Sequence, residues 1–80
     1  MYYVYILKSK KDNSTYTGAT SDLRKRLTEH NSGKMQYTNT KRPYVLAWYC
    51  GFKDKGRAYE FEEYLKSGSG YAFMKKRFIS

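Results

Sequence analysis

A chain of 80 residues has room for one small hydrophobic core and little more. Short chains bury a smaller share of their surface on folding than larger domains do. The core must therefore lie between one or two packed layers of helices and strands. We expect residues 1–80 to form a single domain, without a second catalytic or targeting domain beside it.

Positive charge narrows the choice of partner. The chain carries 16 Lys and Arg against 7 Asp and Glu, a formal net charge of +9. Such an excess favours a polyanionic partner, nucleic acid before an anionic membrane surface. Aromatic residues make up 19% of the chain and could stack on unpaired bases while the cations hold phosphates. The alternatives are that the charge only maintains solubility and that most tyrosines pack in the core and strands.

The single cysteine and the N-terminal residues indicate in which cellular compartment the protein is expected. Cys50 is the single cysteine and cannot form an internal disulfide, and its apolar surroundings favour a small buried hydrophobe over a nucleophile. The opening MYYVYILKSKK places its apolar stretch before its charge, the reverse of a secretory signal. No run of 18 apolar residues is present. We expect a cytoplasmic protein that does not enter a membrane.

Two strands are predicted first. Tyr2–Lys8 is aromatic and β-branched, and Thr15–Thr17 is strand-like again. The intervening Asp12–Ser14 has the composition of a turn, which makes the pair a hairpin. Gly18 is expected to end the second strand.

A short helix and a loop follow. Leu23–Asn31 carries Leu23, Leu27 and His30 on one stripe, with cap oxygens available at Thr20, Ser21 and Asp22 before it and Asn31-Ser32-Gly33 after it. Lys34–Arg42 is a polar loop.

The second half predicts one strand and two helices. Tyr44–Phe52 is apolar at both odd and even positions, which predicts a central strand covered on both faces. Arg57–Lys66 is expected to be a helix, and Ser69 to cap a final basic helix over Gly70–Phe78. The fold class is α/β: a three-stranded, mostly antiparallel sheet flanked by helices, in the order β-β-α-β-α-α.

Ordered short motifs resemble those of a known family. Tyr3-Val4-Tyr5 and Tyr16-Thr17-Gly18 are similar to the Gly-Ile-Tyr and Tyr-Ile-Gly triplets that name the GIY-YIG nucleases. Residues 58–66 resemble the family's Ala-x-x-x-Glu-x-x-Leu-Lys segment, and residues 67–77 the tail of small members of its excinuclease-subunit-C-like branch. Each motif alone is weak, but the ordered set covers nearly the whole chain.

The resemblance implies catalytic roles at matching positions. Glu62 matches the carboxylate that binds Mg²⁺ or Mn²⁺, and Arg26 the arginine that contacts the scissile phosphate. Tyr5 and Tyr16 match the two active-site tyrosines. His30 stands four residues after the arginine, where several members have histidine.

Two positions depart from the family pattern. Tyr3 stands where the family has glycine, which would be tolerated if its side chain faces away from the substrate. Met74–Arg77 offers no counterpart of the late asparagine of many members.

The chemistry can also be argued from the residue types. Phosphodiester hydrolysis needs a nucleophilic water and charge relief on the phosphoryl oxygens, which a carboxylate-bound Mg²⁺ and an arginine fork can supply. Glu62 taken alone could simply form a surface ion pair with Lys66. Helical geometry places it at the border of the stripe formed by Ala58, Phe61 and Leu65. His30 alone could be a packed helix-end histidine.

The sequence therefore predicts a divalent-metal-dependent endonuclease acting on nucleic acid, DNA before RNA, in repair or recombination. A non-catalytic binding module of the same fold and a subunit of a larger repair complex remain alternatives, and a protein partner could supply specificity. Further phosphate contacts are predicted at the basic residues Arg24, Lys25, Lys41, Arg42, Lys75, Lys76 and Arg77. The last three could equally form a solvated face.

Overall fold

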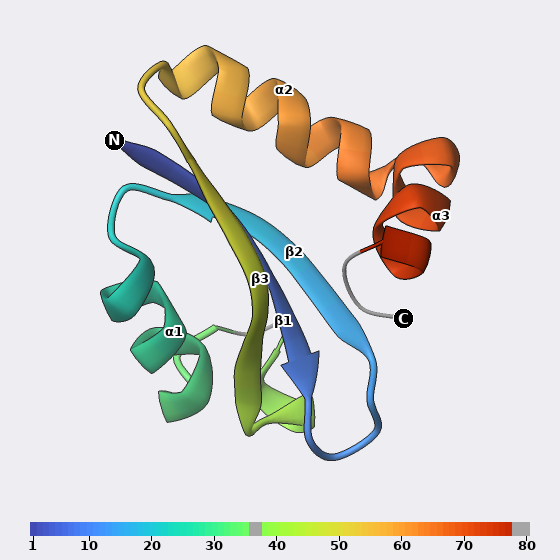
Figure 1. Cartoon of the computed structure of the whole chain (residues 1–80). Helices are drawn as coiled ribbons and strands as arrows, with labels where there is room; N and C mark the ends of the chain where they lie inside the picture. The colour runs from blue at the N-terminus through green and yellow to red at the C-terminus, as the bar shows by residue number, and fades with distance from the viewer. Residues whose placement is uncertain (36–37, 78–80) are drawn as a thin grey trace.

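The computed structural model describes residues 1–35 and 38–77, and its elements confirm the predicted order (Figure 1). Phe78, the predicted end of the last helix, lies outside these residues. The elements are β1 (Tyr2–Ser9), β2 (Thr15–Thr20), α1 (Leu23–Ser32), the 3-10 turn η1 (Asn39–Lys41), β3 (Tyr44–Phe52), α2 (Lys55–Lys66) and α3 (Gly68–Arg77).

Within the described residues the sheet has three strands in the order β2-β1-β3, and β1 pairs antiparallel with both neighbours. The prediction that Tyr44–Phe52 is the central strand is therefore wrong. The central strand is β1, whose residues 4–7 are all buried. An edge strand has one neighbour, and β3 leaves Val45 and Tyr49 exposed although its sequence is apolar at both parities.

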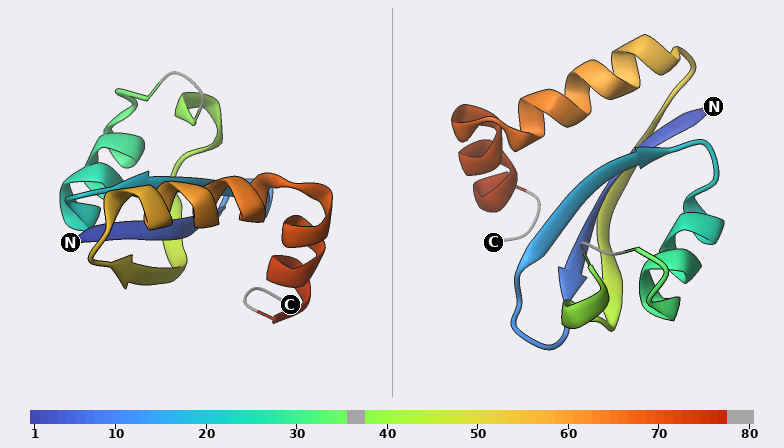
Figure 2. Two further views of the ribbon diagram at one scale, coloured as in Figure 1. Left: turned by 90° about the horizontal axis from the view of Figure 1, so that it is seen from above. Right: turned by 180° about the vertical axis from the view of Figure 1, so that it is seen from behind.

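The helices cover opposite faces of the sheet (Figure 2). Side chains alternate along β1, so Val4 and Ile6 face one side while Tyr5 and Leu7 face the other. Residues from α2 and α3 complete the first core; these are Ala58, Leu65 and Met74. The second core lies under α1, which contributes Leu23 and Leu27. The molecule is thus a three-layer arrangement on a small sheet.

Capping fixes where α1 begins and ends. The Asp22 carboxylate accepts a hydrogen bond from the backbone N–H of Lys25 at 3.0 Å, which satisfies one of the free donors of the first turn. Gly33 adopts φ 87°, a left-handed conformation that closes the helix and favours glycine. Both signals are present in the sequence.

The caps of α2 and α3 differ from those predicted. Asp54 caps α2, which starts two residues before the expected Arg57. The cap of α3 is Ser67 rather than Ser69, because the Ser67 hydroxyl accepts from the backbone N–H of Gly70 at 3.2 Å. Along the ranges 1–35 and 38–77, no helix combines the length and apolarity needed to cross a bilayer.

Candidate active site

Tyr5 occupies the middle of β1, and glycine opposite it makes room for its ring. Tyr5 is paired in register with Gly18 on β2. A Cβ built on Gly18 would collide with the Tyr5 hydroxyl and stand 2.6 Å from its Cζ. The expectation that Gly18 ends its strand is wrong, since β2 continues to Thr20. The glycine of the second triplet is needed for space, and it lets the Tyr5 phenol lie against the sheet.

His30 connects Tyr5 to the loop after α1 through buried hydrogen bonds. The Tyr5 hydroxyl lies 3.0 Å from His30 Nε2, and His30 Nδ1 lies 2.8 Å from the Thr38 hydroxyl. The Thr38 hydroxyl donates to the carbonyl of Met35 at 3.5 Å, so it is placed to accept from Nδ1–H. In that tautomer Nε2 carries the lone pair and Tyr5 donates to it. His30 is therefore positioned as the proton acceptor for Tyr5.

Burial keeps both members of this pair neutral. Burial raises the pKa of Tyr5 above its ordinary value, and the neighbouring Tyr16 and Glu62 act in the same direction, while the Arg26 guanidinium opposes them. Burial lowers the pKa of His30, and the positive charge of Arg26 lowers it further. At neutral pH the pair is thus a phenol and an uncharged imidazole.

Tyr16 stands beside this pair at the open end of the site. It lies on β2, two residues before Gly18, and its ring centroid is 5.0 Å from that of His30 and 6.5 Å from that of Tyr5. Its ring is only partly buried. A substrate could therefore reach Tyr16 before it reaches Tyr5.

Arg26 reaches the site from the first half of α1, one turn before His30. Its side chain is 34% exposed, and its Nε pairs with Glu29 Oε1 at 3.2 Å. It lines a polar hollow of about 300 Å³ on the flank of α1, together with Lys25, Glu29 and residues 20–22. The guanidinium is held from one side by Glu29 and acts on Tyr5 from the other.

Glu62 approaches from α2. Its side chain is 16% exposed, which agrees with a position at the border of the buried stripe. The charge of Glu62 contributes to the raised pKa of Tyr5. Its Oε2 also pairs with Lys66 Nζ at 3.1 Å, so the surface ion pair considered from the sequence does form. Lys66 Nζ lies 5.9 Å from the centre of the Tyr16 ring and thereby links α2 to β2.

The donor set fits a divalent cation that is shared with substrate. Among residues 1–35 and 38–77, no group of three or more His, Cys, Asp or Glu side chains could hold a metal ion on its own. Glu62 can offer carboxylate oxygens, the hard ligands that Mg²⁺ prefers, and such an ion keeps most of its waters and takes phosphate oxygens. The arrangement suits an ion that arrives with a nucleic-acid phosphate.

The five predicted catalytic residues lie in one cluster, whereas the predicted phosphate contacts are spread over the surface. The cluster is Tyr5, Tyr16, Arg26, His30 and Glu62. Arg24 and Lys25 lie on the two flanks of α1, in different hollows. Lys41 pairs with Asp12 at 3.2 Å, and the Arg42 guanidinium packs against Gly33. The remaining three form the exposed last turn of α3 and are Lys75, Lys76 and Arg77.

Comparison with known proteins agrees with this geometry. The sequence model of the GIY-YIG catalytic domain matches residues 1–76. The chain belongs to the GIY-YIG family. It is 45% identical over 69 residues to a UPF0213 protein of Staphylococcus haemolyticus, covering 85% of this chain and 83% of that one. It is 42% identical over 66 residues to the UPF0213 protein YazA of Bacillus subtilis, covering 81% and 66%.

A solved structure shows the same GIY-YIG architecture. The solution NMR structure of a UPF0213 protein from Bacillus halodurans is 36% identical, with a TM-score of 0.57 over 95% of this chain and 84% of that one. The family is a nuclease family, so nucleic acid is the ligand class that membership implies. The names of these relatives add no activity to that statement.

Three features of this GIY-YIG site are not predicted by the sequence patterns. Thr38, the partner of His30, lies in a polar loop whose composition gives no signal for a buried hydroxyl. Lys66 is predicted only as a surface partner of Glu62. The sequence leaves open which way Tyr3 faces; it is two residues before Tyr5 on one strand and therefore shares its face.

Proposed function

We propose that this GIY-YIG protein is a divalent-metal-dependent endonuclease that hydrolyses phosphodiester bonds in DNA. The observation that carries the proposal is the buried chain of hydrogen bonds from Tyr5 through His30 to Thr38. Tyr16 lies beside His30, and the positive charge of Arg26 acts on Tyr5. A packing role alone does not call for a phenol hydrogen-bonded to a neutral imidazole beside an arginine.

The pair can activate water by two linked proton transfers. The proton of Tyr5 moves to His30 Nε2, the Tyr5 oxygen takes a proton from water, and the water oxygen attacks phosphorus as the bond to the leaving oxygen breaks. The leaving oxygen departs as an alkoxide that takes a proton from solvent, and His30 then releases its extra proton to solvent. The raised pKa of Tyr5 and the lowered pKa of His30 oppose this transfer in the free protein. A bound phosphate adds negative charge beside the site and so favours the imidazolium that forms.

The charged residues would stabilise the phosphate. Arg26 can donate to two phosphoryl oxygens, a geometry that a lysine cannot reproduce. Glu62 would hold Mg²⁺ or Mn²⁺, and such an ion, when bound, neutralises charge that develops on the phosphoryl and leaving oxygens. Metal binding would compete with the Glu62–Lys66 ion pair, and pairs with one half-exposed partner contribute little free energy, roughly 1 kcal/mol or less.

The test compares substitution of the proposed metal ligand, Glu62, with substitution of a matched control carboxylate, Glu60. Labelled single-stranded, duplex, flapped and branched DNA is incubated with the protein in Mg²⁺, Mn²⁺ or EDTA. Glu62→Gln should abolish cleavage while DNA affinity is retained. Glu60→Gln, an exposed carboxylate on the same helix, should cut at the unsubstituted rate. Cleavage by Glu62→Gln at the unsubstituted rate in Mg²⁺ would refute the assignment.

A second candidate function is a non-catalytic DNA-binding module. The ion pair between Glu62 and Lys66 favours it, since an i,i+4 pair on a helix is also an ordinary surface feature. The same experiment separates the two. DNA binding without cleavage of any substrate, in either metal, would establish the binding module.

A further inference from the structure

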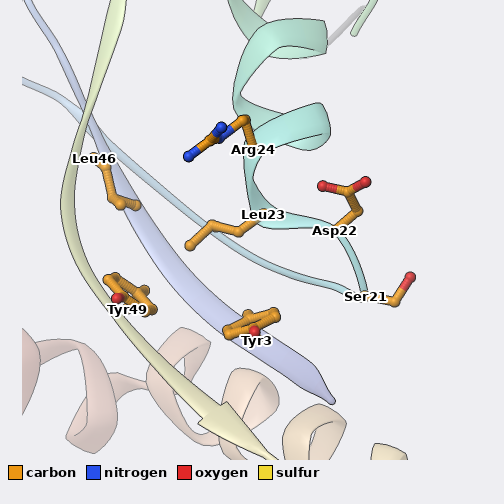
Figure 3. Close-up of a pocket in the computed structure, with 7 residues that line it drawn as sticks. All are labelled: Tyr3, Ser21, Asp22, Leu23, Arg24, Leu46 and Tyr49. Carbon is orange, nitrogen blue, oxygen red and sulfur yellow. The ribbon is translucent and has the colours of Figure 1, made fainter.

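A second hollow lies on the same face of the sheet, between α1 and β3 (Figure 3). Its volume is about 460 Å³, larger than that of the hollow beside Arg26. Tyr3 on β1 and Tyr49 on β3 form one part of it, and Leu23 and Leu46 face each other across another. This is the size of a small-molecule site, and the catalytic chemistry described above does not use it.

The two tyrosines make an open aromatic corner. Tyr49 is 52% exposed, so most of one face of its ring is open to a ligand. The ring centroids of Tyr3 and Tyr49 are 6.1 Å apart and the ring planes are inclined by 59°. A flat ligand that stacks on one ring would therefore meet the other ring edge-on, which is a favourable aromatic contact. The corner suits a planar aromatic ligand better than a branched aliphatic side chain.

A positive charge at the rim of the hollow indicates that the ligand carries phosphate. Arg24 extends from α1 over the hollow toward β3, and its side chain is exposed (Figure 3). The net charge of +9 adds a general attraction for polyanions. On the α1 side, Ser21 and Asp22 supply oxygens that can accept from the amino groups of a base. Aromatic surface, a guanidinium and acceptors at the rim together match a nucleotide.

The hollow is close to the catalytic cluster. Tyr3 precedes Tyr5 by two residues on the same face, a separation of roughly 7 Å along a strand. Tyr49 is the register partner of Tyr5 across β1 and β3. One nucleic-acid strand can therefore occupy both places at once.

We propose that the hollow between α1 and β3 binds an unpaired base next to the cleaved bond, so that the substrate is DNA with a single-stranded segment. This inference rests on the proposed function. A base that is stacked within a duplex cannot enter the corner, because both of its faces are already covered. The stacking platform would thus select single strands, flaps or junctions without reading their sequence.

The test measures binding in the Glu62→Gln background, so that it does not depend on cleavage. The probes are a single-stranded oligonucleotide that contains the fluorescent base 2-aminopurine and a blunt duplex of the same sequence. Tyr49→Leu should weaken single-strand binding by roughly tenfold, the low end for loss of one stacked base. It should leave duplex affinity unchanged. Tyr49→Phe, which keeps the ring, should bind as well as the Glu62→Gln parent.

Two further measurements complete the design. Tyr59→Leu removes another exposed tyrosine, on α2, and should change neither affinity. Binding should quench 2-aminopurine fluorescence in the parent and in Tyr49→Phe but not in Tyr49→Leu. Equal losses for single strand and duplex, or an unchanged single-strand affinity in a Tyr49→Leu protein with a normal melting curve, would overturn the proposal. Failure of cleavage in the unsubstituted protein would leave this result standing.

Discussion

Three adjacent cations on α1 differ in what they can do, although they carry the same charge. Arg24, Lys25 and Arg26 have the same charge, yet only Arg26 acts on the pKa values of both Tyr5 and His30. The Arg26 side chain is 34% exposed and is held by the ion pair with Glu29. It therefore loses less conformational freedom on binding a phosphate than an unrestrained side chain would. Proximity and restraint, rather than charge, single out Arg26.

Arg26→Lys should therefore lower the single-turnover cleavage rate at saturating enzyme by about a hundredfold, the usual loss for one preorganised donor to a transition state. Arg24→Ala and Lys25→Ala should mainly lower affinity and leave that rate near the unsubstituted value. If Arg24→Ala abolished cleavage while Arg26→Lys still cleaved DNA, the assignment of Arg26 as the catalytic arginine would be wrong.

His30 gives a pH signature that needs no substrate. It is the single histidine of the chain, and its pKa is lowered in the fold, chiefly by burial. The unfolded chain therefore takes up a proton more readily than the folded protein. The stabilising contribution is complete above the ordinary histidine pKa of about 6.5 and is lost as pH falls below it toward the lowered value.

The melting temperature should accordingly fall between pH about 7.5 and about 5.5, a range centred on the ordinary histidine pKa. His30→Gln should melt lower overall but with a shallower dependence on pH, and the difference in slope is the measurement. Equal slopes in the two proteins would mean that His30 titrates in the fold as it does in the unfolded chain, and a steeper fall in His30→Gln would mean that folding raises its pKa.

At the scale of elements, contact between α2 and α3 depends on one glycine. A Cβ on Gly70 would collide with the carbonyl oxygen of Tyr64 and stand 2.9 Å from the Cα of Leu65. Gly68, in the same first turn of α3, has open space around its Cα. Gly70→Ala should lower the free energy of unfolding by about 2 kcal/mol through overpacking, and Gly68→Ala should leave it unchanged or raise it.

Urea denaturation of both variants gives this comparison directly. If Gly70→Ala is as stable as Gly68→Ala, the two helices do not pack as closely as the structure shows. Because α2 carries Glu62, a loosened α3 should also reduce cleavage in Gly70→Ala.

Sequence patterns locate the elements well because each pattern depends on local periodicity and caps. They fail for the identity of the central strand, since pairing on both edges is a tertiary property. Apolar residues at both parities of Tyr44–Phe52 predict burial, but part of that surface is the open aromatic corner at Tyr49. Tyr49 therefore adds to the apolar pattern of the segment without belonging to the core.

The candidate site, like the fold, is only partly predictable from the sequence. Tyr5, Tyr16 and Glu62 can be proposed from the sequence, because they stand in ordered motifs that resemble those of the GIY-YIG family. No motif points to Thr38, because a hydroxyl that accepts from a buried imidazole is set by the path of the loop in space. The prediction for Gly18 is wrong, because this glycine lies inside β2 and makes room for the Tyr5 ring on the neighbouring strand, a tertiary contact that no local pattern reports.

At the scale of the whole molecule, positive charge lies on more than one side of the sheet. Arg24 and Lys25 belong to α1, whereas Lys75, Lys76 and Arg77 form the last turn of α3 on the opposite face. A single duplex lying across the catalytic face would not touch both sets equally. How much each set contributes to binding can be read from the salt dependence of affinity.

Binding of the Glu62→Gln protein to duplex DNA should weaken steeply with salt, because each neutralised phosphate releases a condensed counterion and adds about 0.9 to the slope of log K against log salt. A slope of several units is expected from the net charge of +9.

Replacing the three cations of the last turn of α3 together by alanine should reduce the slope by about one unit for each phosphate that they neutralise. The matched control is a triple alanine variant at the exposed residues Lys10, Lys11 and Lys53. These lie in the turns that follow β1 and β3, and their substitution should leave the slope nearly unchanged. Equal reductions in both triple variants would mean that only overall charge matters and that α3 is a solvated face. A flat salt response in the parent would remove phosphate recognition, and nucleic acid with it, from the function of this chain.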